Sequence, residues 1–236
     1  MSNVLLNVAD LGLSFEDKVV LSHISFSLSS GERVGLVGPS GGGKSVLLKT
    51  LAGIYKPTYG KVDFDPSNKI GFLFQEGGLF DSMNVEHNVA FPLINDGVDI
   101  VKALEKSREI LNQVGLSGAE KKFPAELSGG MRRRVGIARA LINSPKMLMI
   151  DDPTGGLDPV ASSIILDLLL ELQKSTQAAV LIASHDLRRL IPRVDRIISL
   201  FNGEVVYDGN KEDLKNQKSG ETVKFLQNRI EVENIC

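Results

Sequence analysis

One eight-residue stretch limits the possible folds of this chain more than any other. Residues Gly38–Ser45 read Gly-Pro-Ser-Gly-Gly-Gly-Lys-Ser and match the phosphate-loop pattern G-x-x-x-x-G-K-[ST]. The apolar run Arg33–Val37 precedes the loop and predicts a strand, and Val46–Leu51 follows with a helical pattern. Glycines let a backbone wrap closely around phosphate oxygens, and the start of the next helix adds positive potential. The stretch therefore predicts a strand, a phosphate-binding loop and a helix in an α/β nucleotide-binding fold.

The loop also assigns roles to side chains. We expect Lys44 to reach the β- and γ-phosphates of a nucleoside triphosphate, and the Ser45 hydroxyl to hold Mg²⁺. Phe15 is a candidate for stacking on the adenine face, although a single Phe in an amphipathic strand is usually a core residue. A glycine-rich turn that binds nothing is the alternative, and the correct flanking elements argue against it. The predicted nucleotide-binding residues are Phe15, Gly38, Pro39, Ser40, Gly41, Gly42, Gly43, Lys44, Ser45 and Val46.

Short apolar runs, each followed by a turn signal and a helical pattern, recur along the chain and predict a mainly parallel sheet. These runs are Arg33–Val37, Lys69–Phe74, Met147–Ile150, Ala179–Ala183 and Arg196–Phe201. Three earlier segments instead suggest a smaller antiparallel layer: Val4–Ala9, Val19–Leu21 and Lys61–Asp63. Strand signals vanish between about Glu76 and Pro145, where Ile100–Val114 and Gly130–Ile142 have helical patterns. The expected fold is α/β, of the P-loop NTPase class, with a helical subdomain inserted in it.

The C-terminal part of the chain offers weaker signals. Asp158 and Pro159 suit the N-cap and first position of a helix that carries Leu168 and Leu172. We expect one ATPase domain over residues 1–210 and a C-terminal extension over 211–236. Within that extension, Thr222–Ile230 could form a short helix that docks on a partner.

Polar residues follow the predicted strands where a ligand crevice is expected. Asp151 ends one strand and could accept a hydrogen bond from Mg²⁺-bound water, and the next residue, Asp152, could orient or deprotonate the attacking water. Gln75 could join the Mg²⁺ shell or hold the water, and His185 could donate to the γ-phosphate. Each has a structural alternative: a turn for the aspartates, and a packing role for His185 and Gln75. The predicted metal ligands are Ser45, Gln75 and Asp151, and the predicted catalytic residues are Asp152, His185 and Gln75.

Composition excludes several other classes of protein. The chain has 236 residues, a formal net charge of −2 and 42% hydrophobic residues, which is ordinary for a globular protein without a broad basic surface. Nucleic acid is therefore not an expected partner. No run of about 18 apolar residues is present, and the N-terminal residues do not resemble a signal peptide. The single cysteine, Cys236, fits a reducing compartment.

A further motif gives the chain a family resemblance. Leu127–Met131 reads Leu-Ser-Gly-Gly-Met and resembles the signature of ABC ATPases, which usually ends in Gln. The other family motifs occur in the expected order: Phe15, Gly38–Ser45, Gln75, Met147–Asp151, Gly155–Asp158 and His185. The resemblance covers roughly Val4 to Asn210. It implies an ATPase that uses ATP and Mg²⁺ and pairs head to tail with a second copy, with Ser128, Gly129, Gly130 and Asp158 acting on the partner's nucleotide.

A narrower resemblance concerns the segment after Gln75. Residues 74–93 are similar to the corresponding segment of the Mla-type lipid-transport ATPases, which serve MCE-domain systems. This resemblance implies phospholipid or another lipid-like substrate, an integral-membrane permease partner, and possible MCE-domain and small regulatory subunits. It also implies a position at the cytoplasmic face of the inner membrane. The apolar Leu79, Phe80 and Met83 would suit a groove for a permease helix. The run Arg132–Arg134 is expected to lie on a solvated or interface face.

One position departs from the ABC pattern. Most ABC ATPases have Glu where this chain has Asp152, and the shorter side chain loses roughly 1.5 Å of reach. Slow turnover is expected, which keeps a low-turnover, nucleotide-gated regulatory module among the possible functions. A soluble non-transport ABC ATPase, such as the Fe–S assembly type, is the other alternative to a transporter subunit.

Overall fold

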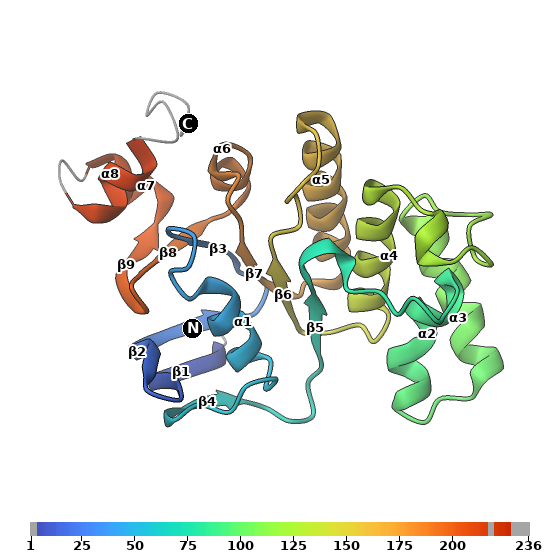
Figure 1. Cartoon of the computed structure of the whole chain (residues 1–236), viewed down its shortest axis with the longest axis horizontal. Coiled ribbons are helices and arrows are strands. Elements are labelled where there is room, and N and C mark those ends of the chain that lie inside the picture. Colours follow the sequence, from blue (N-terminus) through green and yellow to red (C-terminus); the bar gives the residue numbers. More distant parts are fainter. Residues whose placement is uncertain (1–3, 217–219, 228–236) are drawn as a thin grey trace.

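The core of the molecule is a six-stranded sheet with most of the helices on one face, and one helix and a smaller sheet on the other. A computed structural model describes residues 4–216 and 220–227 of the chain. The six strands lie in the order β5-β6-β7-β3-β8-β9 (Figure 1). Their bounds are β3 Arg33–Val37, β5 Ile70–Leu73, β6 Met147–Asp151, β7 Ala179–Ala183, β8 Arg196–Phe201 and β9 Glu204–Asn210. Neighbouring strands from β5 to β8 run parallel, as the sequence predicted.

Strand β9 was missed by the sequence analysis. It pairs antiparallel with β8 after a turn that contains Asn202 and Gly203, both with positive φ. Its side chains alternate between half-buried and exposed, so it lacks the continuous apolar run that marks the other strands. Strand β9 therefore forms one edge of the six-stranded sheet.

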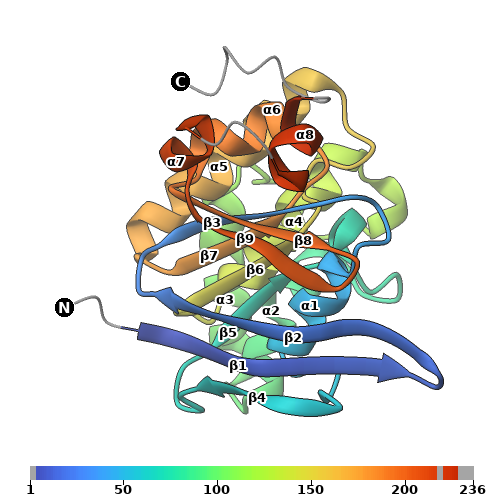
Figure 2. The ribbon, with the colours of Figure 1, turned by 90° about the vertical axis from the view of Figure 1, so that its left-hand side faces the viewer.

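The smaller antiparallel sheet contains β2 Lys18–Ser29, β1 Val4–Phe15 and β4 Tyr59–Phe64 in that order (Figure 2). The first two strands are longer than the predicted segments. Register shifts interrupt the pairing of β1 with β2, for example between Val8 and Leu11, and Asp10 has a positive φ. Such bulges break the alternation of apolar and polar residues from which strand length is predicted.

The helices fill the connections between strands. Their bounds are α1 Lys44–Leu51, α2 Val85–Asn95, α3 Ile100–Gln113, α4 Gly129–Leu141, α5 Pro159–Thr176, α6 Leu187–Leu190, α7 Lys211–Asn216 and α8 Glu221–Gln227, with short 3₁₀ turns at Gln75–Gly77, Pro124–Glu126 and Ile191–Arg193. Asp158 caps α5, because its carboxylate accepts from the backbone amides of Val160 and Ala161. In the described parts of the chain, no helix is both long and apolar enough to span a bilayer.

Two apolar cores cover the two faces of the large sheet. One joins the sheet to α1 and the antiparallel layer, with Leu21, Leu47 and Met149 fully buried in it. The other joins the sheet to α5 and to the packed helices α2, α3 and α4, and includes Val89 and Leu111. The strands β3, β6 and β7 are therefore buried on both sides, which fixes the positions of the loops at their carboxyl ends.

The C-terminal helices lie against the same domain. Thr222 and Val223 of α8 are buried, and the Phe225 ring meets the Phe201 ring of β8 edge-on with centroids 5.4 Å apart. The predicted helix Thr222–Ile230 is thus observed up to Gln227. Residues 228–236, including Cys236, lie outside the described part of the chain, and docking of this extension on a partner stays a prediction.

A buried carboxylate holds the helical block together. Glu86 of α2 is fully buried and forms ion pairs with Arg108 of α3, at 3.0 Å, and with Lys121 of the following loop. Burial alone would raise the pKa of Glu86, but the hydrogen bonds from Lys121 and Arg108 outweigh it and lower the pKa. The charged form of Glu86 therefore stabilises the fold.

We expect Glu86→Gln to lower the free energy of unfolding by about 1–3 kcal/mol at neutral pH. Because folding lowers the pKa of Glu86, its stabilisation is complete above the ordinary value of 4.5 and is lost as pH falls through the lower, folded value. Urea unfolding at neutral and acidic pH measures both effects, with the exposed Glu105→Gln as control. Equal stability of the parent and Glu86→Gln at pH 7 would contradict this account.

Candidate nucleotide site

Six of the ten predicted nucleotide-binding residues line one cavity at the carboxyl edge of the parallel sheet, and Phe15, Gly38, Pro39 and Gly42 are not among its lining residues. Its volume is about 200 Å³. The cavity is lined by Val20, Ser40, Gly41, Gly43, Lys44, Ser45, Val46, Gln75, Asp151, Asp152, Ala183, Ser184 and His185. The loop after β3, the loop after β6 and the loop after β7 meet there because the three strands are parallel neighbours. Residues more than 100 positions apart in the sequence thus face one another.

The phosphate loop depends on glycine at several positions. Gly38, Gly41 and Gly43 have φ values of 149°, 77° and 97°, which other residues rarely adopt. A side chain at Gly38 would also overlap the carbonyl oxygen of Leu200 on β8. The backbone of β8 therefore lies directly against Gly38 and limits the conformations that the loop can adopt.

Lys44 is buried at the base of the loop. Its Nζ donates to the carbonyl oxygens of Gly38 and Pro39, at 2.9 and 2.8 Å, and its side chain is 6% exposed. These bonds curl the loop around the ammonium group. The positive charge lies where the loop amides and the start of α1 would meet an anion.

Ser45 and Asp151 form the candidate magnesium site. The Ser45 hydroxyl donates to Asp151 Oδ1 at 2.8 Å, which joins α1 to the end of β6. Burial raises the pKa of Asp151, while the Ser45 bond and the charges of Lys49 and Lys44 oppose the shift. One hydroxyl and one carboxylate fit Mg²⁺, which is usually held by few protein oxygens together with nucleotide phosphates.

Asp152 lies beside this site on an unusual backbone. Its φ is 43°, its amide donates to the Ala183 carbonyl at 2.9 Å, and its side chain is 8% exposed. A Cβ added to Gly155 would lie 2.5 Å from Asp152 Oδ2, so the carboxylate rests against the backbone of Gly155. The loop that follows β6 thus fixes the direction of this carboxylate.

Gln75 and His185 are exposed side chains that line the same cavity from opposite sides. Gln75 begins the 3₁₀ turn after β5, and His185 follows β7. Their placement matches the predicted crevice, and their proposed catalytic roles stay predictions. Exposure argues against the alternative that either is a packing residue.

Phe15 is not among the residues that line this cavity. It ends β1, is 43% exposed, and meets the Tyr55 ring edge-on with centroids 5.2 Å apart. The exposure of the ring makes a pure core role wrong. Stacking on adenine stays a prediction.

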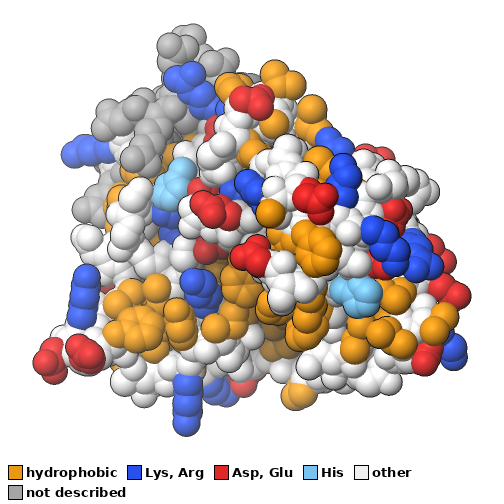
Figure 3. Space-filling model, turned by 45° about the vertical axis from the view of Figure 1, so that its right-hand side comes forward, with side chains coloured by type: hydrophobic (Ala, Val, Ile, Leu, Met, Phe, Trp, Pro, Cys, Tyr) orange, Lys and Arg blue, Asp and Glu red, His pale blue; other side chains and the backbone are white. Residues whose placement is uncertain are grey.

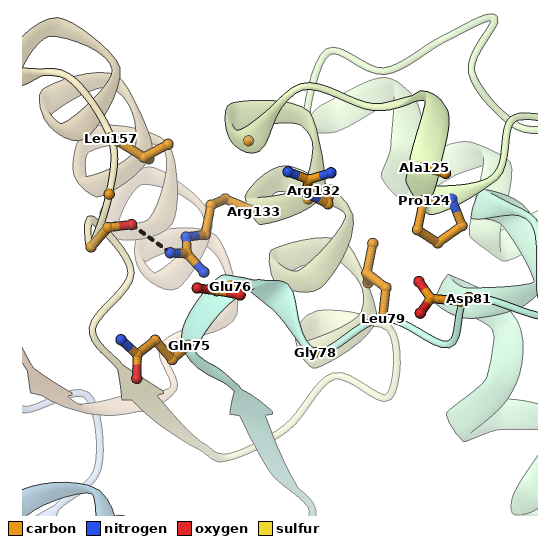
Figure 4. A pocket seen from close by; sticks show the side chains of 13 residues that line it. Gln75, Glu76, Gly78, Leu79, Asp81, Pro124, Ala125, Arg132, Arg133 and Leu157 are labelled. Carbon is orange, nitrogen blue, oxygen red and sulfur yellow. Dashed lines mark hydrogen bonds between the residues drawn. The ribbon is translucent and has the colours of Figure 1, made fainter.

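The signature residues start α4 and lie apart from the phosphate loop. Ser128 caps this helix, because its hydroxyl accepts a hydrogen bond from the Met131 amide at 3.3 Å. Gly129 lines a second cavity of about 520 Å³ with Gln75, Gly155 and Gly156 (Figure 4). Neither Ser128, Gly129, Gly130 nor Asp158 lines the cavity of the phosphate loop. Within one chain the two sets of residues do not form one site.

The expectation that residues 132–134 lie on a solvated or interface face is wrong for Arg133, which is buried inside the domain. Its side chain is 3% exposed, and Nη2 donates to the Gly155 carbonyl at 2.7 Å. Arg139 was also missed: it is 8% exposed and donates to the Gly77 carbonyl at 2.9 Å. Helical periodicity gives no signal for these contacts, because the partners come from the loops after β6 and β5.

Comparison with known proteins assigns a family to these features. The family model described as "ABC transporter" matches residues 21–155. The chain is 34% identical to the methionine import ATP-binding protein MetN of Bacillus subtilis, with 97% of this chain and 73% of MetN covered. It is 37% identical to the protein TRIGALACTOSYLDIACYLGLYCEROL 3 of Arabidopsis thaliana, covering 88% and 69%. It is also 37% identical to the lipoprotein-releasing system protein LolD of Legionella pneumophila, covering 87% and 98%.

Solved structures agree with this. A dimeric post-hydrolysis state of the ATP-binding cassette MJ0796 bound to ADP and Pi has a TM-score of 0.77 and 29% identity, covering 87% of this chain and 98% of the other. The cbiO1 protein of Clostridium perfringens, part of the transporter complex cbiONQ, has a TM-score of 0.80 and 29% identity, covering 98% of both chains.

We expect Gly38→Ala to weaken ATP binding at least about tenfold, because the new methyl group would push the loop away from β8 and misplace its amides. Titration with a fluorescent ATP analogue in Mg²⁺ measures the affinity. Gly53→Ala is the matched control, since Gly53 also has a positive φ but no atom lies within 4 Å of the added Cβ. Unchanged affinity in Gly38→Ala would show that β8 does not set the loop geometry.

Proposed function

We propose that this chain, which belongs to the ABC transporter family, powers the movement of phospholipid or another lipid-like substrate through a membrane permease. As an ABC ATPase it binds ATP with Mg²⁺ and hydrolyses it. The single observation that carries the pairing of two copies, on which this function depends, is the division of the site between two cavities. Residues of the phosphate loop line one cavity, and Gly129 of the signature lines another.

A second copy of the chain completes the site. Helix α4 has 13 residues, and its first turn presents free backbone amides and positive potential at Ser128–Gly130. In a head-to-tail pair this end meets the γ-phosphate held by the partner's loop, with Asp158 beside it. The dimeric MJ0796 structure, bound to ADP and Pi, supports such a pair. ATP then favours the closed pair, and loss of the γ-phosphate opens it.

Hydrolysis is assigned to Asp152. Its carboxylate lines the cavity next to the Ser45–Asp151 pair, where it can orient the water that attacks the γ-phosphate. Gln75 and His185 contact the same water or phosphate from either side. Asp is shorter than Glu by roughly 1.5 Å, and a misplacement of this size slows catalysis about a hundredfold. Turnover is therefore slow but dependent on Asp152.

A third cavity suits the permease. It has a volume of about 550 Å³ and lies between β5 and the helices α2 and α4. Its walls are mostly apolar: Ile70, Gly71, Phe72, Phe74, Gln75, Gly78, Phe80, Phe91, Pro92, Arg139, Ala140 and Asn143. Figure 3 shows hydrophobic side chains gathered on the lower half of the face that carries these helices. A short amphipathic helix of a membrane subunit fits a groove of this kind.

The groove is held in shape by a buried amide. Asn88 of α2 accepts from the Phe80 amide at 2.7 Å and donates to the carbonyls of Phe80 and Met83, at 3.0 and 2.8 Å. The Phe80 ring packs on Phe91 at 4.8 Å, and the Arg139 guanidinium lies 5.6 Å from its centroid. Because Gln75 lines both this groove and the nucleotide cavity, docking can reach the active site directly.

The lipid assignment rests on two kinds of similarity. Residues 74–93 resemble the corresponding segment of the Mla-type lipid-transport ATPases. In addition, the name of the Arabidopsis relative is that of a glycolipid, and LolD is named for lipoprotein release. MetN, which is named for methionine import, is similarly related, so the names alone do not decide the substrate. With this assignment, the chain works at the cytoplasmic face of the inner membrane, with MCE-domain and small regulatory subunits as further partners.

The two alternatives make different predictions. A soluble ABC ATPase of the Fe–S assembly type would purify with soluble partners only. A regulatory module would bind ATP without steady turnover. Recovery of a polytopic membrane subunit with the chain supports transport, and sustained phosphate release argues against the regulatory module.

We expect Asp152→Asn to lower kcat at least about a hundredfold, because the amide cannot accept a proton from the attacking water. ATP affinity should change little, and phosphate release under saturating ATP measures the effect. Asp65→Asn, in an exposed turn, serves as control. A variant as fast as the parent would show that another residue activates the water.

We expect Phe80→Asp to lose the membrane subunit during purification of the assembly, because a carboxylate would be buried against Phe91 and the docking helix. Val206→Asp, at a similarly exposed apolar position on β9, should retain it. Subunit composition of the detergent-purified assembly is the measurement, and the thermal midpoint of each free variant checks its fold. Equal recovery with Phe80→Asp would place the docking surface elsewhere.

A further inference from the structure

Arg133 occupies a position that neither phosphate binding nor permease docking explains. It lies one turn into α4, yet its side chain leaves the helix and reaches the loop after β6, where Nη2 donates to the Gly155 carbonyl at 2.7 Å (Figure 4). Figure 4 also shows Glu76 next to the guanidinium, on the turn that follows β5. The Arg133 side chain, which starts on the signature helix, thus bonds the loop after β6 and lies near the turn after β5.

The guanidinium is poorly satisfied for a buried cation. Nε and Nη1 are buried and have no hydrogen-bond partner among the described residues. Burial lowers the pKa of Arg133, and the charges of Asp152 and Glu76 oppose the shift. A buried cation with unpaired N–H groups costs stability, so packing alone does not account for it.

Both carboxylates that attract Arg133 lie on strained backbone. Asp152 has a φ of 43° and Glu76 a φ of 63°, values that residues other than glycine seldom adopt. Backbone strain of this kind persists only where the surroundings enforce it, and it gathers at functional sites. The attraction of the guanidinium for both carboxylates is one force that can maintain these conformations.

Gly155 connects Arg133 to Asp152, because it contacts both side chains. Arg133 fixes the carbonyl of Gly155, and the Cα of the same Gly155 lies against the Asp152 carboxylate. The Gly155 residue thus lies between the guanidinium and the carboxylate.

We propose that Arg133 is a positioning residue for hydrolysis. It holds the Gly155 peptide and, through that peptide, fixes the direction in which the Asp152 carboxylate points. Since Arg133 belongs to the helix that begins with the signature, movement of α4 during pairing reaches Asp152 through it. This inference rests on the proposed role of Asp152 in activating water.

The test compares Arg133→Met, which removes the charge and the donors, with Arg133→Lys, which keeps the charge and one donor group. We expect Arg133→Met to lower kcat at least about tenfold, while the KM for ATP changes less than about twofold. Its thermal midpoint should equal or exceed that of the parent, because a poorly paired buried cation is removed. Arg133→Lys should recover part of the lost kcat.

Arg134→Met is the matched control. This neighbour donates a hydrogen bond to the Val114 carbonyl, at 3.4 Å, inside the helical block, so its removal should leave kcat near the parental value. A merely structural role for Arg133 predicts the opposite pattern, a fall in thermal midpoint together with kcat. That pattern, or a parental kcat in Arg133→Met, would overturn the inference.

A double-variant cycle separates this inference from the role of Asp152. If Arg133 acts through Asp152, adding Arg133→Met to Asp152→Asn should lower kcat little further. Full additivity would overturn the proposed path while leaving Asp152 as the group that activates water. Parental turnover in Asp152→Asn would overturn both.

Discussion

Parallel pairing of β6, β7 and β3 is the constraint on which the rest of the molecule depends. It brings the carboxyl ends of three strands to one edge, so that Lys44, Asp151 and His185 meet although they are far apart in the sequence. The apolar cores on both faces keep these strands in register. Strand β8 pairs parallel with β3, and its Leu200 carbonyl lies against Gly38 of the phosphate loop.

Sequence patterns predicted the features that depend on local chemistry. The parallel strands, the glycine loop and the cap at Asp158 each carry their cause within a few residues, and the structure confirms them. Because bulges interrupt β1, its full length could not be predicted from the sequence. Strand β9 was not predicted at all, because its half-buried and exposed residues alternate and give no continuous apolar run. The placement of Gln75, Asp152 and His185 around one cavity followed from their positions just after predicted parallel strands.

The contacts of α4 could not be predicted in the same way. The spacing of Met131, Val135 and Ala138 indicates one apolar face, but the helix is enclosed by α2, α5 and the turn after β5 as well. Arginines on the remaining faces are therefore buried against backbone carbonyls supplied by distant loops. The boundary at residue 210 and the partner of the C-terminal extension likewise depend on information beyond local sequence.

Helix α4 runs from the signature, at its N-terminal end, to the apolar groove proposed for the permease, at its C-terminal end. Arg139 anchors it to the Gly77 carbonyl at one end, and Ser128 lies at the other, about 16 Å away at 1.5 Å per residue. With Arg139 as fulcrum, a tilt of only about 5° would carry the signature end sideways by roughly 1.4 Å. Hydrogen bonds to a phosphate tolerate only a few tenths of an ångström. In the proposed pair, a slight tilt of α4 is therefore enough to make or break the contact of the signature with the partner's nucleotide.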